Sequence, residues 1–191
     1  MIKCISTKIV ELWSRNRIID VTDKESYGYG MELILSTLLN IMLMMILSFI
    51  LIKHPIAFLP YMIVYIPLRL FAGGYHADRH WKCILYTQST FVGWVMFINI
   101  MARYNAWYIL VELMLAGLII VVMAPVEASN KPLNEKERRK QKYITWFIQG
   151  VVLMAVLLFV LLGYLENTIV LCGIAANISV AFSLLLAKIR E

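Results

Sequence analysis

The sequence predicts an all-α, polytopic integral membrane protein with about six transmembrane helices, preceded by an amphipathic N-terminal helix. Hydrophobic residues make up 61% of the 191 residues, and the mean hydropathy is +0.76. These residues gather in runs of roughly 18–22, which as helices would cross a hydrocarbon core of about 30 Å. Almost all basic residues lie between the runs, as expected for loops that set a membrane topology.

Residues 1–30 are expected to form a cytoplasmic amphipathic segment. Apolar residues recur there at roughly helical spacing, with basic residues between them, and the apolar set is Ile2, Ile5, Ile9, Val10, Leu12 and Trp13. Such a helix suits the surface of an anionic inner leaflet. A helix packed against the cytoplasmic side of the protein would show the same pattern. The segment lacks the continuous apolar run of a signal peptide.

Residues 31–187 are expected to form a bundle of six spans within one membrane-embedded domain, 1–191. The expected spans are 31–52, 55–72, 83–102, 106–125, 144–163 and 168–187. Each is long enough to cross a bilayer as a helix. Residues 126–143, which include the run KERRKQK, are expected to form a basic cytoplasmic loop.

The positions of the basic residues predict the orientation. Of the 18 Lys and Arg residues, all but Lys53 and Arg103 lie in residues 1–30, 69–82, 126–143 and 188–191. The positive-inside rule therefore puts these four segments and both termini in the cytoplasm. The net charge of +6 then serves topology and contact with anionic lipid. No recognition fold accompanies the basic run, so we expect no nucleic-acid partner.

The polar gap FAGGYHADRHWKC, residues 71–83, holds the candidate chemistry. His76 and Cys83 are seven residues apart, which is about 10.5 Å along a continuous helix. A nucleophile and its base must approach within roughly 2.6–3.2 Å, so a His76–Cys83 pair requires the chain between them to fold back. Gly73 and Gly74 would permit such a turn. We expect Cys83 at the start of the third span, where a helix N-terminus and basic neighbours favour a thiolate.

Two alternatives compete with a thiol site. His76, His80 and Cys83 have the spacing of three metal ligands on one helix face, but Ala77 stands where the H-E-x-x-H motif has its glutamate. No fourth ligand is close in sequence, so we expect neither a metal nor another cofactor. Interfacial histidines and a small apolar cysteine would explain the gap without any chemistry. Cys4 and Cys172 suggest no disulfide framework.

The gap also resembles a family signature, R-x-x-x-G-G-x-H-A-x-x-x-x-x-C, which is made here by Arg69, Gly73, Gly74, His76, Ala77 and Cys83. It is similar to the signature of the accessory gene regulator B (AgrB) family, bacterial membrane cysteine endopeptidases that process quorum-sensing peptide precursors. The amphipathic N-terminus, the number of spans and the basic segment after the fourth span extend the resemblance over nearly the whole chain. The stretch APVEASNKPL, residues 124–133, looks like the proline- and lysine-containing loop of that family.

The resemblance implies that Cys83 is the nucleophile and His76 its general base. The substrate would be a small AgrD-like propeptide, cleaved near its C-terminus through a thioester on Cys83 and cyclised to a thiolactone or a lactone. The implied location is the bacterial cell membrane, with the active site at the cytoplasmic face. A homodimer is one option that the sequence leaves open, because Gly117, Gly150 and Gly173 would allow close helix approach between protomers.

Further residues are expected to support this site. Glu32, at the cytoplasmic start of the first span, would orient His76, with Asp78 as a rival, or would pair with Arg69 or Lys24. Arg69 would extend its side chain to the membrane interface without a protein partner, bind a carboxylate of the substrate, or form an ion pair with Glu32. Gly73, Gly74 and Lys131 are expected to contribute to substrate binding.

The alternative to a peptidase is a small membrane transporter or exporter of a peptide or small molecule, without peptidase chemistry. Its polar pathway would use Glu32, Arg69 and Glu112. The sequence shows neither an internal repeat nor broken helices in matching halves, which many transporters have. A membrane scaffold without chemistry is a third possibility.

Overall fold

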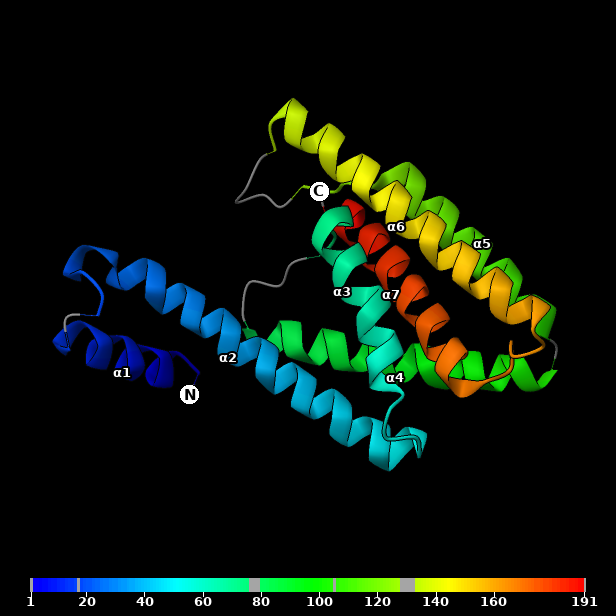
Figure 1. The fold of residues 1–191 in the computed structure, drawn as a ribbon, viewed down its shortest axis with the longest axis horizontal. Helices are drawn as coiled ribbons and strands as arrows, with labels where there is room; N and C mark the ends of the chain where they lie inside the picture. The colour runs from blue at the N-terminus through cyan, green and yellow to red at the C-terminus, as the bar shows by residue number, and fades with distance from the viewer. Residues whose placement is uncertain (1, 17, 76–79, 105, 128–132, 191) are drawn as a thin grey trace. The chain divides into compact units, whose positions relative to one another are not determined.

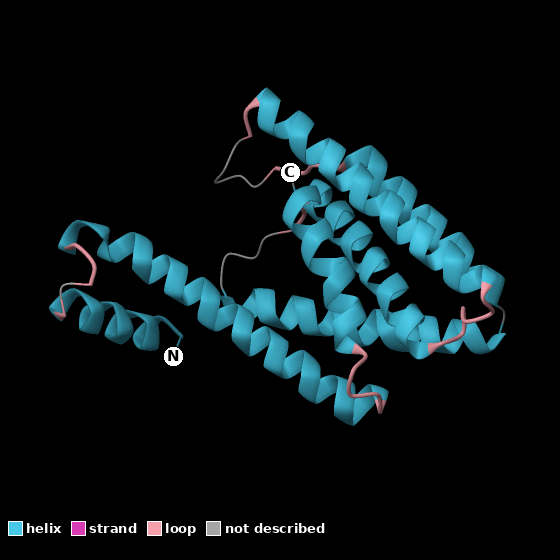
Figure 2. Ribbon diagram, in the orientation of Figure 1, coloured by secondary structure: helices cyan, strands magenta, loops and turns pink. Residues whose placement is uncertain are grey.

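The computed structural model describes residues 2–16, 18–75, 80–104, 106–127 and 133–190. These residues form helices and connecting loops, with no strand among them (Figures 1 and 2). The chain divides into two compact units, Met1–Met44 and Met45–Glu191. The predicted all-helical fold is therefore confirmed for the described part of the chain.

The first unit contains the N-terminal helix α1, Ile2–Arg15, and most of helix α2, Lys24–Leu47. A short 3-10 turn, Val21–Asp23, precedes α2. Ser6 on α1 is buried, and its Oγ donates a hydrogen bond of 3.4 Å to Oε1 of Glu32 on α2. The predicted N-terminal helix is thus present, whereas its contact with a lipid surface stays a prediction.

The second unit begins with the end of α2 and a π-helical turn, Ser48–Ile52. Five helices come next along the chain, namely α3 Phe58–Ala72, α4 His80–Tyr104, α5 Ala106–Met123, α6 Glu135–Leu161 and α7 Thr168–Arg190. Helix α7 is the core, because it packs against α3, α4 and α5 (Figure 1). Its buried face carries small residues that let neighbouring helices approach closely, among them Cys172, Ala175, Ala176, Ala181 and Ser183.

Four helical stretches in the described residues are long and apolar enough to span a membrane: Lys24–Ile52, Trp81–Tyr104, Glu135–Leu161 and Thr168–Ile189. Helices α3 and α5 are apolar but shorter. The chain is thus a helical membrane protein, as its composition predicted. The number of six spans and their orientation stay predictions.

One end of the second unit gathers the chain after α3, the chain after α5 and the last turns of α7. The backbone N–H of Val126, after α5, donates to the carbonyl of Ala72 at the end of α3, at 2.9 Å. The N–H of Tyr75 donates to the carbonyl of Ser183 near the end of α7, at 3.1 Å. Residues 72–75, 126 and 183 therefore lie together at this end, and the side of the membrane that this end faces stays a prediction.

The basic run Lys136–Lys142 differs from the predicted loop, because it forms the first turns of α6. The carboxylate of Glu137 accepts the backbone N–H of Asn134 at 3.1 Å, which satisfies a donor at the helix start. Lys, Arg, Glu and Gln are also good helix formers. The loop expected over 126–143 thus ends at residue 134, and the fifth apolar helix begins earlier than 144.

Buried polar pairs join α7 to its neighbours. Nδ2 of Asn177 donates to Oε1 of Gln149 on α6 at 2.8 Å, and the hydroxyl of Tyr61 on α3 donates to Oγ of Ser179 at 2.9 Å. Such bonds hold helices together where lipid removes the hydrophobic drive between them. Gly117 on α5 leaves the space that Gln149 occupies, because a Cβ there would lie 2.8 Å from Nε2 of Gln149.

Gly117→Leu should therefore destabilise the bundle. The new side chain would displace Gln149 and break its bond to Asn177, and overpacking of this kind costs about 1–3 kcal/mol. The matched control is Gly150→Leu on α6, where an added Cβ meets no atom within 4 Å. Thermal unfolding of the detergent-solubilised variants measures the difference. Equal melting temperatures for the two variants would contradict this packing.

Candidate active site

Cys83 lies in the first turn of α4, which begins at His80. Its side chain is exposed, and its carbonyl oxygen accepts a hydrogen bond from Oγ1 of Thr87 at 2.8 Å. Backbone N–H groups of a first turn lack intrahelical partners and carry the positive end of the helix dipole. The structure thus places Cys83 at a helix start, as the sequence predicted. Lys82 beside it packs over the ring of Trp81.

The segment that leads toward His76 is fixed to the end of α7. Tyr75 donates its backbone N–H to both the carbonyl oxygen and Oγ of Ser183, each at 3.1 Å. The guanidinium of Arg69, one turn before the end of α3, donates to the carbonyl oxygens of Gly73 and Tyr75. Arg69 therefore holds the backbone of this segment. Its predicted contact with a substrate carboxylate stays a prediction.

Gly73 and Gly74 make this docking possible. Their φ angles are +75° and +120°, a backbone conformation that residues other than glycine rarely adopt. A Cβ on Gly73 would collide with the carbonyl of Val126, and one on Gly74 would collide with Arg69 and lie 2.7 Å from Oγ of Ser183. The two glycines thus allow close backbone approach, and their predicted part in substrate binding stays untested.

The two sides of the polar gap meet at a pair of tyrosines. The rings of Tyr75 and Tyr86 have centroids 5.2 Å apart. On a continuous helix, two residues eleven positions apart would be separated by about 16.5 Å along the axis. Tyr75 directly precedes His76 and Tyr86 lies one turn after Cys83, so the flanks of the gap approach as a His–Cys pair requires.

Sequence reasoning missed Tyr75, Tyr86 and Ser183 as parts of this site. A tyrosine beside the glycines and a serine near the end of an apolar helix are both common in membrane proteins. Neither residue type signals a tertiary partner by itself. The contacts join the chain after α3 to α4 and α7, which are distant in the sequence.

Several predicted site residues cannot be placed against Cys83. His76, Asp78 and Lys131 lie outside the described residues. Glu32 belongs to the first unit, where it accepts the bond from Ser6. Its role as orienter of His76 therefore stays a prediction.

The described residues contain no cluster of three His, Cys, Asp or Glu side chains that could hold a metal ion. His76 is not among those residues, and the side chain of His80 is likewise not described. The arrangement with ligands at His76, His80 and Cys83 is therefore untested.

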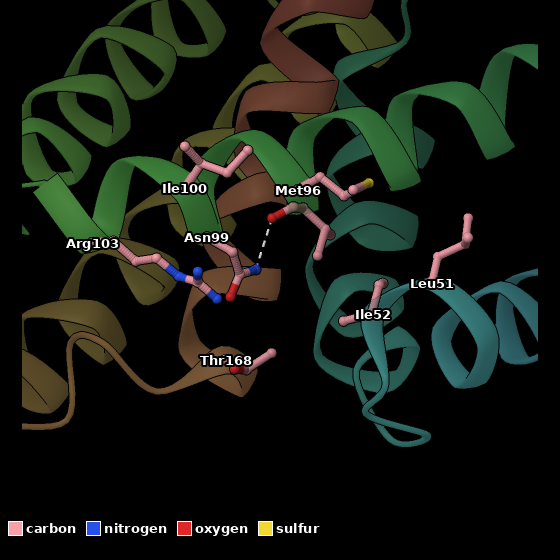
Figure 3. A pocket seen from close by; sticks show the side chains of 8 residues that line it. Leu51, Ile52, Met96, Asn99, Ile100, Arg103 and Thr168 are labelled. Carbon is pink, nitrogen blue, oxygen red and sulfur yellow. Dashed lines mark hydrogen bonds between the residues drawn. The ribbon is translucent and has the colours of Figure 1, made fainter.

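A pocket of about 290 Å³ lies at the other end of α4 (Figure 3). Asn99, Arg103 and Thr168 give it a polar side, and Nδ2 of Asn99 donates to the carbonyl of Val95 at 2.7 Å. Asn99 is sixteen residues after Cys83, which is about 24 Å along a helix. This pocket is thus separate from the candidate site.

Gly74→Ala should release the segment from α7, because the added methyl group would collide with Arg69 and Ser183 in a backbone conformation that alanine rarely adopts. Hydrogen exchange of the Tyr75 amide in detergent measures the effect, and we expect a clear loss of protection. Gly30→Ala is the control, since a Cβ at Gly30 meets nothing within 4 Å. Unchanged protection in Gly74→Ala would contradict the docking.

Arg69→Lys should loosen the same segment although the positive charge is kept. A guanidinium can donate to two carbonyl groups from one planar fork, whereas an ammonium is a point charge on a flexible stem. We expect faster exchange of the Tyr75 amide in Arg69→Lys. Full protection in this variant would show that charge alone suffices and that the two-carbonyl clamp is unimportant.

Comparison with protein families supports the membership suggested by the gap. The model of the family described as accessory gene regulator B matches residues 5–185, nearly the whole chain. No curated protein and no solved structure matched. The family match implies involvement in the processing of quorum-sensing peptides, with an AgrD-like propeptide as the substrate. This chain belongs to the accessory gene regulator B (AgrB) family.

Proposed function

We propose that the chain is a membrane-embedded cysteine endopeptidase that cleaves the C-terminal part of a small quorum-sensing propeptide and permits its cyclisation. The observation that carries this proposal is the approach of Tyr75 to Tyr86, which brings the flanks of His76 and Cys83 together. The exposed thiol in the first turn of α4 supplies the nucleophile.

In the first step, His76 takes the proton of the Cys83 thiol as sulfur attacks the scissile carbonyl. The tetrahedral intermediate collapses with cleavage of the C–N bond. The leaving amine receives the proton from the His76 imidazolium. The products are a free C-terminal peptide and a thioester between Cys83 and the remaining propeptide.

In the second step, a cysteine or serine within the propeptide attacks this thioester. His76, neutral after the first step, takes the proton of the attacking thiol or hydroxyl. The new bond to that sulfur or oxygen closes a thiolactone or lactone ring, and the Cys83 thiolate leaves and regains a proton from the His76 imidazolium. A thioester keeps the acyl group activated, and a tethered nucleophile has a high effective concentration. Cyclisation exceeds hydrolysis when the site restricts water, as a site at a membrane interface does.

The surrounding residues have supporting roles in this proposal. Arg69 fixes the backbone at Tyr75, which directly precedes His76. Glu32 orients the imidazole of His76. Lys131 and the basic turns of α6 attract the charged tail of the propeptide. Both termini and the site face the cytoplasm, from which the substrate arrives.

The test uses the chain in vesicles with a propeptide that has an internal cysteine and a charged C-terminal tail. Cys83→Ser should abolish the thioester adduct, and His76→Ala should slow cleavage by about 10²–10⁴-fold, the usual contribution of a general base. Mass spectrometry follows both the cleavage and the mass added to Cys83.

Cys4→Ser is the matched control, because Cys4 is also an exposed free cysteine but lies on α1. This variant should cleave as the wild type does. Cleavage by Cys83→Ser and His76→Ala at the wild-type rate would overturn the proposal. Loss of wild-type activity on addition of a chelator would point to metal chemistry instead.

A further inference from the structure

A groove of about 600 Å³ lies along α4 and α7 in the second unit. The groove is shallow and open to its surroundings. Its lining is largely apolar and aromatic and includes Trp94 and Phe97 of α4 with Phe182 and Leu186 of α7. Of these lining residues, Phe97 and Phe182 are exposed.

The groove continues the helix face that carries Cys83. Its lining residues Tyr86, Thr90, Gly93 and Phe97 recur on α4 at steps of three and four, which mark one face of a helix. Cys83 lies three positions before Tyr86, one turn nearer the helix start. The exposed thiol and the groove therefore share one face of α4.

The other wall also meets the candidate site. Phe182 of α7 lines the groove, and the next residue, Ser183, holds the backbone N–H of Tyr75. The ring of Tyr75 contacts Tyr86, the groove residue nearest Cys83. One end of the groove thus lies where the two flanks of the polar gap meet.

We propose that this groove binds the apolar side chains of the propeptide residues that immediately precede the scissile bond. This inference rests on the proposed function of Cys83. Those residues stay bonded to Cys83 in the thioester, so they must lie next to the groove that begins one turn away. An apolar groove rejects the charged tail, which leaves with the C-terminal peptide.

The groove thereby selects propeptides with bulky apolar residues before the cut and holds the acyl group during ring closure. A lipid chain or a second copy of the protein could occupy an apolar groove anywhere on the surface. An acyl group bonded to Cys83 can occupy only a groove that begins beside Cys83, as this one does.

Gly93 offers a direct test, because it lines the groove and a Cβ there meets no atom within 4 Å. Gly93→Leu would place a branched side chain in the groove from a position with free space around its Cβ. Gly150→Leu is the matched control, an equally open helical glycine on α6 outside the groove. Both variants also carry Cys4→Ser, so that the exposed Cys4 thiol does not compete with Cys83 for the reagent.

Gly93 lies ten residues after Cys83, about 15 Å along α4, so the peptide reagents need about four extended residues to reach it. The measurement is the rate at which Cys83 is alkylated by acetyl-Leu-Leu-Leu-Phe chloromethyl ketone (the Leu-Phe reagent), acetyl-Ala-Ala-Ala-Ala chloromethyl ketone (the Ala-Ala reagent) and iodoacetamide, followed by mass spectrometry. In each case the Cys83 sulfur bonds to the reagent's methylene carbon and the halide leaves. The unsubstituted background should react faster with the Leu-Phe reagent than with the Ala-Ala reagent. Gly93→Leu should lower the Leu-Phe rate about tenfold, within the range for a pocket that loses apolar contacts.

Iodoacetamide should label Cys83 equally in all variants, and Gly150→Leu should resemble the background with every reagent. The proposal falls if Gly93→Leu leaves the Leu-Phe rate unchanged or slows all three reagents alike. It also falls if the background does not prefer Leu-Phe, or if Gly93→Leu changes only the oligomeric state.

Failure of the groove and failure of the peptidase are distinguishable, because alkylation requires no peptide cleavage. Selective labelling without propeptide cleavage would sink the proposed function alone. Cleavage through Cys83 without the Gly93 effect would sink the groove alone.

Discussion

The candidate site depends on the attachment of one short backbone segment to the end of α7. Tyr75 donates its N–H to Ser183, and Arg69 donates to the carbonyl groups of Gly73 and Tyr75. These bonds satisfy backbone groups that would otherwise be costly near the apolar bundle. They also fix where the chain enters the gap that contains His76, and so set what can face Cys83.

Helix α7 can serve as this platform because its neighbours surround it. Of its apolar window, 72% is buried, against 33% for the next most buried of the candidate spans. Its small residues admit close packing, and the Asn177–Gln149 and Tyr61–Ser179 bonds fix it to α6 and α3. A site whose residues come from α3, α4 and α7 is thereby held by the most enclosed helix in the second unit.

Local patterns in the sequence were enough to predict the helices and the position of Cys83. Apolar run lengths predicted the helices, and the change from a polar gap to an apolar run placed Cys83 at a helix start. The charge of Lys136–Lys142 predicts a side of the membrane but not a conformation, and the helix there follows from the helix-forming tendency of Lys, Arg, Glu and Gln. The contacts of Tyr75, Tyr86 and Ser183 join residues up to 108 positions apart, and no local pattern encodes such contacts.

A His76–Cys83 pair requires above all that positions 76 and 83 lie close together. We would substitute His76→Cys in a Cys4→Ser background and oxidise the chain in native membranes, following the disulfide with Cys83 by mass spectrometry. Disulfides form readily when the two Cβ atoms come within about 3.5–4.5 Å. We predict a faster bond than in a Trp81→Cys variant of the same background, whose new thiol is two residues from Cys83 on α4. Oxidation at His76→Cys no faster than at Trp81→Cys would contradict a His76–Cys83 pair.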